Sequence, residues 1–118
     1  MSNPQERLKN IYRKIGFIEA ICEEDGSITN ALSDEKRSRA SILMHLTSIA
    51  EQFNKLAEEA EFDLLNQFDK NDLKGSYDVR NYIAHDYEGV NLSVIEFVIR
   101  DKLPKIKVTI ENILSSLE

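Results

Sequence analysis

RLKNIYRKIGFIEAIC, residues 7–22, repeats apolar side chains at the three-and-four spacing of one helical face. The face consists of Leu8, Ile11, Tyr12, Ile15, Ile18 and Cys22. Asn3 can cap this helix, with Pro4 at its first position and Glu6 in capping-box register. Asp25-Gly26 supplies a stop, because glycine readily takes the left-handed conformation that ends helices. The pattern therefore predicts a first helix between Asn3 and Asp25.

A second helix is predicted by the same periodicity. Ser33 is its expected cap, and Asp34 and Glu35 would complement the positive end of the helix dipole. One apolar stripe then continues along the segment: Leu43, Leu46, Ala50, Phe53, Ala57 and Ala60. We expect this helix to be the longest and to end at about residues 59–61.

Two more helices complete the predicted fold. The polar run at residues 69–72 reads as a loop or helix boundary, and the segment at about 73–86 is again helical. The last helix starts at Asn91 or Ser93, and Pro104 removes one of its backbone hydrogen bonds, which predicts a kink or short break. No segment alternates with the period of a strand. We therefore expect an all-α antiparallel bundle of four to five helices.

Size and composition set the general class. The 118 residues fit one domain, expected to span residues 1–118. The lone Cys22 excludes an internal disulfide, and two histidines give little support to a metal site, so neither metal nor cofactor is expected. No apolar run approaches the roughly 18 residues of a membrane span, and no signal peptide is recognisable. A cytoplasmic protein is predicted, and its net charge of -6 argues against broad binding to nucleic acid.

The stretch RNYIAHDY, residues 80–87, carries the candidate chemistry. On a helix Asn81 and His85 share a face, whereas Arg80 lies about 140° around from His85 at about 100° per residue. One chain would therefore struggle to focus both groups on one small ligand. A two-fold dimer packed along this helix can bring two copies into one cleft, because such an interface repeats every group.

Such a cleft suits metal-free RNA cleavage, in which a 2′-hydroxyl attacks its own phosphodiester. His85 can relay a proton near neutral pH, and Arg80 offers a planar, permanently charged fork to phosphate oxygens. Asn81 can orient the imidazole or hold a ribose oxygen. The same residues can instead satisfy the last carbonyls of a helix, with Tyr82 and Tyr87 as packing residues, and spacing alone favours this simpler interpretation.

The segment resembles the R-N-x-x-x-H-x-Y motif of HepT proteins, the HEPN toxins paired with a minimal nucleotidyltransferase antitoxin. The resemblance continues through residues 88–92 and Leu103-Pro104, and upstream through residues 46–51, where Ile-Gly-Glu is common in the family. It thus covers nearly the whole chain. The chain departs from the family pattern in three ways. Ala50 replaces a glycine, Asp78 stands where a glycine often precedes the arginine, and the tryptophan common ahead of the motif is absent.

This resemblance implies a HEPN-like helical bundle and a homodimeric, metal-independent endoribonuclease toxin that acts on cellular RNA, with tRNA as a substrate by analogy. Arg80 and His85 would be essential and Asn81 supportive. Tyr87 would accept AMP from the cognate antitoxin. The added phosphate and nucleotide would then block RNA by repulsion and by occupancy.

Two other functions stay open. The bundle can be a non-catalytic substrate-binding or regulatory subunit of a nucleotidyltransferase, which the acidic net charge and Asp78 favour slightly. It can also be a plain scaffold dimer in which the motif is incidental.

Charged residues elsewhere have ordinary explanations beside functional ones. Two basic clusters can steer RNA phosphates or simply form solvated helix faces: Lys36, Arg37 and Arg39, and Lys102, Lys105 and Lys107. His45, on the predicted second helix, is expected to be a boundary or surface residue rather than a ligand.

Overall fold

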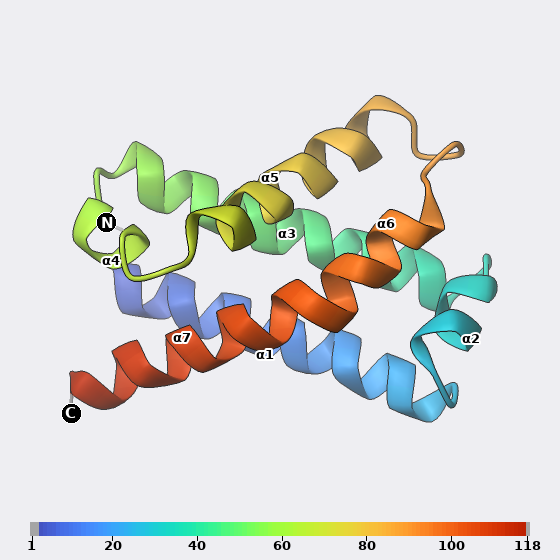
Figure 1. The fold of residues 1–118 in the computed structure, drawn as a ribbon, viewed down its shortest axis with the longest axis horizontal. Helices are drawn as coiled ribbons and strands as arrows, with labels where there is room; N and C mark the ends of the chain where they lie inside the picture. The colour runs from blue at the N-terminus through green and yellow to red at the C-terminus, as the bar shows by residue number, and fades with distance from the viewer. Residues whose placement is uncertain (1–2, 118) are drawn as a thin grey trace.

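The computed structural model describes residues 3–117, and this part of the chain contains helices and no strand. In chain order the elements are α1 (Pro4–Glu24), α2 (Ile28–Ser33), α3 (Ser38–Glu58), α4 (Phe62–Leu65), α5 (Lys70–His85), α6 (Leu92–Phe97), the π-helical segment η1 (Val98–Lys102) and α7 (Leu103–Ser116). Long helices run antiparallel to their neighbours, with α3 between α1 and α5 (Figure 1). The predicted all-α antiparallel bundle is confirmed.

Helix α1 begins and ends where the sequence predicts. The Asn3 side chain accepts a hydrogen bond from the Gln5 backbone N–H at 2.9 Å, and Pro4 takes the first turn. Glu6 does not close a capping box with Asn3 in this structure but lies 3.6 Å from Lys9 Nζ. The apolar face is buried as expected, because Leu8, Ile11, Ile15, Ile18 and Cys22 all lie in the core.

The start of α3 differs from the prediction. Ser33 does not cap α3; it is the last residue of the one-and-a-half-turn helix α2. The carboxylate of Asp34 instead accepts long backbone hydrogen bonds from Arg37 (3.3 Å) and Ser38 (3.4 Å) as the chain turns into α3. The far end agrees with the prediction, since α3 ends at Glu58 with Glu59 as its C-cap. Short helices such as α2 bury too few apolar residues to give a periodic signal, which is why the sequence did not predict it.

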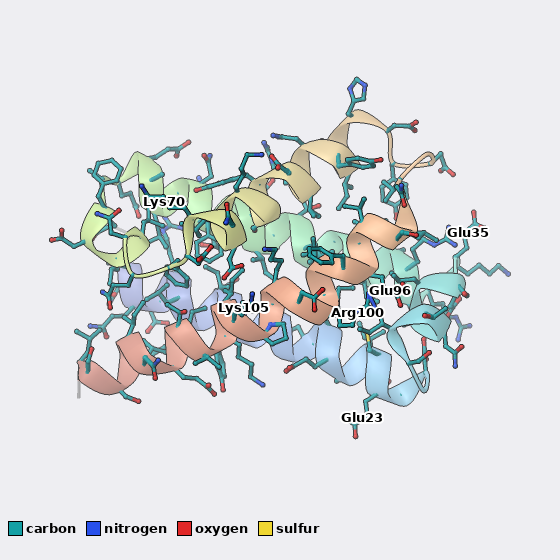
Figure 2. All side chains as sticks on the ribbon, viewed as in Figure 1. Glu23, Glu35, Lys70, Glu96, Arg100 and Lys105 are labelled. Atoms are coloured by element: carbon teal, nitrogen blue, oxygen red, sulfur yellow. The ribbon has the colours of Figure 1, made fainter. Side chains whose placement is uncertain are left out.

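One apolar core lies between the long helices. Its largest fully buried side chain is Phe53 of α3, whose ring meets that of Phe68 edge-on at 5.2 Å between centroids. Charged side chains lie on the outside of the bundle, among them Glu23 and Glu35 (Figure 2). This core fixes α3 and therefore the helix that packs on it, α5.

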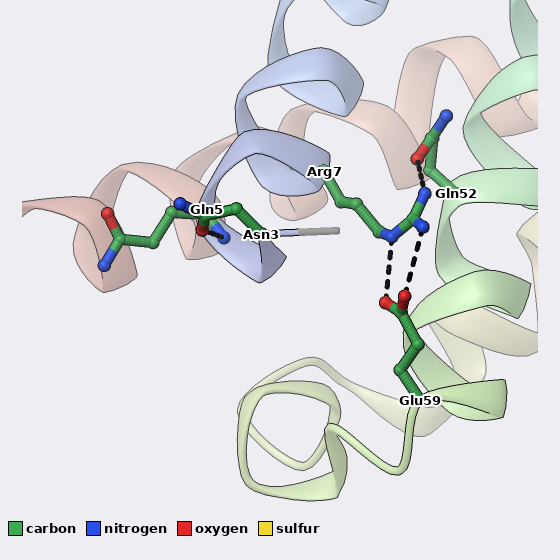
Figure 3. Close-up of polar contacts among 5 residues, drawn as sticks. All are labelled: Asn3, Gln5, Arg7, Gln52 and Glu59. Carbon is green, nitrogen blue, oxygen red and sulfur yellow. Dashed lines mark hydrogen bonds and ion pairs between the residues drawn. The ribbon is translucent and has the colours of Figure 1, made fainter. Parts of the chain in front are cut away.

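A polar clamp joins the start of α1 to the end of α3, at one end of this antiparallel pair. Arg7 of α1 donates to both carboxylate oxygens of Glu59, at 2.9 and 3.2 Å, and to Gln52 Oε1 at 2.9 Å (Figure 3). The hydrogen bonds from Arg7 lower the pKa of Glu59 from its ordinary value. Such a two-pronged arginine contact fixes relative orientation as well as distance.

The last helical run is irregular just before Pro104, where the sequence predicts a kink or short break. The run has no break between α6 and α7 (Figure 1), but the five residues that join these helices are π-helical. The Leu103 N–H donates to the Val98 carbonyl, one residue farther back than in an α-helix. The proline, which has no N–H to give, is thus placed in the first turn of α7. None of the helices formed by residues 3–117 has the length and hydropathy to cross a lipid bilayer.

Candidate functional site

Helix α5 carries the candidate residues. The Asp69 side chain caps it by accepting from the backbone N–H groups of Asn71 (2.8 Å) and Asp72 (3.3 Å), so α5 begins three residues before the predicted start. Four side chains on one face are buried: Asp72, Ser76, Val79 and Ile83. Because this face packs on α3, the orientation of every other α5 residue is fixed.

Arg80 lies on the side of α5 that faces α3. Its Nη2 is 4.0 Å from Oε1 of Glu51, and the two side chains are 44% and 54% exposed. At that distance the pair is an electrostatic contact without a hydrogen bond. Solvent screens such an exposed pair, so Arg80 can exchange Glu51 for a stronger anion at little cost.

His85 and Asn81 face away from the core. Both are exposed, and neither side chain has a hydrogen bond or ion pair among residues 3–117. His85 is the last residue of α5 and lines a pocket of about 290 Å³ with Tyr82, Asp86 and Gly89. Its imidazole is therefore open to solvent and to a ligand.

The turn after α5 is held by Asp86. Its Oδ1 accepts a hydrogen bond of 2.9 Å from the Gly89 backbone N–H. A Cβ at position 89 would overlap that carboxylate, so a larger residue would have to displace the Asp86 side chain. The turn fixes where the chain leaves His85 and where Tyr87 lies.

The chain does not bring Arg80 and His85 together. Five residues at about 100° each place them about 140° apart around the helix. The contacts agree with this geometry, because Arg80 meets α3 whereas His85 lines a pocket formed by the end of α5 and the following turn. Asn81 lies one turn before His85, so it is the nearest predicted partner of the imidazole.

Tyr87 lies beyond the end of α5, with 48% of its surface exposed. It borders a groove of about 580 Å³ between α3 and α5, which we call the α3–α5 groove. The other lining residues are Ala40, Leu43, Met44, Thr47, Ser48, Glu51 and Ile83. Tyr87 and His85 thus border two different hollows on either side of the α5 end.

Asp78 is the acidic departure from the family pattern, and a neighbouring lysine offsets its negative charge. Its carboxylate pairs with Lys74 Nζ at 2.8 Å, one turn earlier on α5. This hydrogen bond raises the pKa of Lys74. The pair adds no net charge to the exposed face that carries Asn81 and His85.

Half of the residues in the two predicted basic clusters make contacts within the bundle. Lys102 pairs with the buried Asp72 at 3.3 Å and Lys107 with Glu19 at 2.9 Å, while Arg39 donates to a backbone carbonyl of α2 at 2.7 Å. The other three cations of these clusters are exposed: Lys36, Arg37 and Lys105. Figure 2 labels Lys105 on α7.

His45 is half-buried against the ring of Phe17, 5.4 Å between centroids. Burial, with a smaller contribution from Lys14, lowers the pKa of His45. It is the boundary residue that the sequence predicted. Residues 3–117 contain no cluster of three or more histidine, cysteine or acidic side chains able to hold a metal ion.

Sequence reasoning assigned no role to Glu51 and did not foresee the groove. Glu51 lies in the segment 46–51 that resembles the family, but its place beside Arg80 depends on how α3 and α5 pack. Met44 lies outside the apolar stripe of α3 and is 73% exposed, but a single exposed apolar residue is ordinary, so the sequence held no signal for this surface.

Comparison with known proteins gives one result. The family model described as "Ribonuclease HepT-like" matches residues 9–113, which extend from α1 into α7. Searches of curated proteins and of solved structures gave no match.

Proposed function

This chain belongs to the HepT-like ribonuclease family, and from that premise we propose that it is a metal-independent endoribonuclease that works as a homodimer. The observation that carries the proposal is the separation of Arg80 and His85 around α5. Among residues 3–117, Arg80 has only the 4.0 Å contact to Glu51 and His85 has no hydrogen bond or ion pair, so both can act on a ligand. A second copy is needed to bring the two kinds of group to one phosphate.

A two-fold axis beside the exposed face of α5 provides this arrangement. Such an axis places the same face of the second copy opposite the first, in antiparallel orientation. In the shared cleft, Arg80 of one copy faces His85 of the other. Tyr82, which is 41% exposed on α5, adds apolar surface for the contact.

The chemistry follows from these two side chains. Neutral His85 accepts the proton of the ribose 2′-hydroxyl as its oxygen bonds to phosphorus. The bond from phosphorus to the 5′-oxygen breaks, and a protonated imidazole returns a proton to that leaving oxygen. Arg80 stabilises the charge on the phosphoryl oxygens with its planar fork, and Asn81 orients the imidazole. The products are a 2′,3′-cyclic phosphate and a 5′-hydroxyl.

We further propose that the protein is the toxin of a toxin–antitoxin pair that acts on cellular RNA, with tRNA as a substrate. Its partner is a minimal nucleotidyltransferase that transfers AMP to Tyr87. The exposed position of Tyr87 at the end of α5 supports this role. An attached AMP would place negative charge and bulk beside the cleft and would exclude RNA.

Cleavage is tested with the purified dimer, cellular RNA and a metal chelator. The parent should cut RNA, whereas Arg80→Ala and His85→Ala should each lose most activity. Arg13→Ala, an exposed arginine on α1 far along the sequence from the motif, is the matched control and should cut normally. Full cleavage by His85→Ala would refute the assignment. A parent that neither cuts RNA nor arrests growth would favour the non-catalytic subunit of a nucleotidyltransferase.

The modification is tested separately by mass spectrometry after incubation with the partner and ATP. Tyr87→Phe should lose the added AMP and Tyr82→Phe should keep it, because the two tyrosines are similarly exposed, at 48% and 41%. Equal labelling of the parent and Tyr87→Phe would place the modification elsewhere.

A further inference from the structure

The α3–α5 groove has the form of a small-molecule site. Its volume of about 580 Å³ falls within the roughly 300–1,000 Å³ of ligand pockets, which are mostly apolar with a few polar groups. Leu43 and Ile83 are buried and form the floor, while Met44 and Tyr87 are exposed at the rim. A flat aromatic ligand can therefore lie on an apolar floor beside a tyrosine ring and a polarisable thioether.

The polar edge of the groove offers hydrogen-bond acceptors, and one cation lies next to it. Glu51 lines the groove, and neither of its carboxylate oxygens takes part in a hydrogen bond within the described chain. The nearest cation is Arg80, at 4.0 Å from Oε1. A ligand that fits here presents N–H donors to Glu51 and a phosphate to Arg80.

The hydroxyl groups of the groove contribute less than Glu51 to the choice of ligand. Thr47 already donates its hydroxyl hydrogen to the Leu43 carbonyl at 2.9 Å, so only its oxygen lone pairs remain available. Ser48 has no side-chain hydrogen bond among residues 3–117 and can donate or accept. The decisive group for selectivity is thus the carboxylate, which only accepts.

Among nucleobases, guanine is the best match to this carboxylate. Its N1–H and N2–H donors are adjacent and point the same way, so they pair with the two oxygens of one carboxylate. Adenine and cytosine each place a lone pair beside their single amino group, and uracil flanks its one N–H with two carbonyls. Those lone pairs would face the negative charge of Glu51.

We propose that the α3–α5 groove binds a guanine base of the RNA substrate, with Glu51 as the residue that selects the base. The inference rests on the proposed ribonuclease function and names the base that the enzyme prefers beside the scissile bond. Arg80 links the two sites, because its Nη2 lies 4.0 Å from Glu51 of the groove and the same guanidinium holds the phosphate. Glu51 has no role in proton transfer.

Binding is tested without any need for cleavage. The chain has two methionines, so protein labelled at methionine methyl groups gives two NMR signals, and Met44→Leu identifies the one in the groove. Titration with GMP should move the Met44 signal and leave that of Met1 unchanged. Inosine monophosphate lacks only the N2 amino group and should bind roughly tenfold more weakly, because one hydrogen bond to a charged acceptor is lost.

Three substitutions separate base selection from a structural role. Glu51→Gln should bind GMP and inosine monophosphate equally, whereas Glu51→Asp, which keeps the carboxylate, should retain a weaker preference for GMP. Glu58→Gln makes the same charge change on the exposed face of α3 and should behave as the parent. An unmoved Met44 signal with every nucleotide, or an unchanged preference in Glu51→Gln, would overturn the inference.

Cleavage of short RNAs that differ at one position separates this inference from the proposed function. The parent should cut beside guanine about tenfold faster than beside inosine at that position, and Glu51→Gln should lose this difference. Cleavage with no base preference would overturn the guanine site and leave the ribonuclease intact. GMP binding at Met44 without any cleavage would overturn the ribonuclease and would identify the groove as a site for free guanine nucleotides.

Discussion

The α1–α3 layer and the C-terminal end of α5 differ in how far their side chains are buried. In the layer, seven side chains of α3 and five of α1 are buried, and the Arg7–Glu59 clamp closes one end. At the end of α5 and in the turn that follows, every residue from Ala84 to Gly89 is exposed. The site residues there have few contacts of their own. Stability and chemistry therefore lie in different parts of the molecule, and substitutions should separate them.

The largest loss of stability is expected from Phe53→Ala. Phe53 is fully buried against Phe68, so its truncation leaves a cavity and should cost about 3–5 kcal/mol in the free energy of unfolding. Phe62→Ala, at a phenylalanine that is 56% exposed, is the control and should change stability by about 0.5 kcal/mol or less. Urea denaturation followed by circular dichroism measures both. Similar losses in the two variants would contradict the assigned core.

A smaller loss is expected where α5 meets the π-helical segment. Lys102→Met leaves the carboxylate of Asp72, which is only 4% exposed, without its partner and should cost about 2 kcal/mol. Adding Asp72→Asn should recover part of this loss, because the uncompensated charge is removed. Lys105→Met, at an exposed lysine one turn away, should be close to neutral in the same denaturation experiment. A neutral Lys102→Met would show that the pair does not anchor α5.

A gain in stability is expected at the end of α3. Ala60 has a φ of 58°, in the left-handed region that glycine adopts without strain. The Glu61 N–H donates to the Leu56 carbonyl at 2.9 Å, as in a Schellman motif that normally has glycine at this position. Ala60→Gly should therefore raise the free energy of unfolding by about 0.5–1 kcal/mol. Ala57→Gly, within the last turn of α3, should lower it by about 1 kcal/mol. If Ala60→Gly lowered the free energy of unfolding as much as Ala57→Gly, the backbone at Ala60 would not be strained.

The smallest effect on stability is expected at the site itself. His85→Ala removes an exposed side chain that has no hydrogen bond or ion pair within residues 3–117, so the free energy of unfolding should change by about 0.5 kcal/mol or less. Its thermal unfolding curve should superimpose on that of the parent, although cleavage is lost. A large shift of the midpoint would mean that His85 has a structural role. The loss of cleavage would then follow from destabilisation of the fold.

The difference between the buried core and the exposed end of α5 also explains what the sequence could predict. Side chains such as Ile11 and Ile15 of α1 repeat with the helical period, and that signal needs no tertiary information. The cap of α5 was missed because Asp69 stands in a polar run that also fits a loop. The divergence of Arg80 from His85 followed from helical geometry alone.

The α3–α5 groove could not be predicted from either segment. Its lining comes from two helices whose residues, such as Met44 and Tyr87, are far apart in the chain. Glu51 becomes a neighbour of Arg80 only when the two helices pack. Local periodicity does not predict such pairings, because it shows which face of a helix is buried but not which helix packs against that face.

The measurement that tests the central claim most directly is the activity of a mixed dimer. Arg80→Ala and His85→Ala chains, co-expressed with different affinity tags, give a heterodimer that can be purified through both tags. If each site pairs Arg80 of one copy with His85 of the other, one of the two sites is intact and the heterodimer should have about half the activity of the parent. Each variant homodimer should be inactive. A heterodimer as inactive as both homodimers would contradict a site shared in this way between two chains.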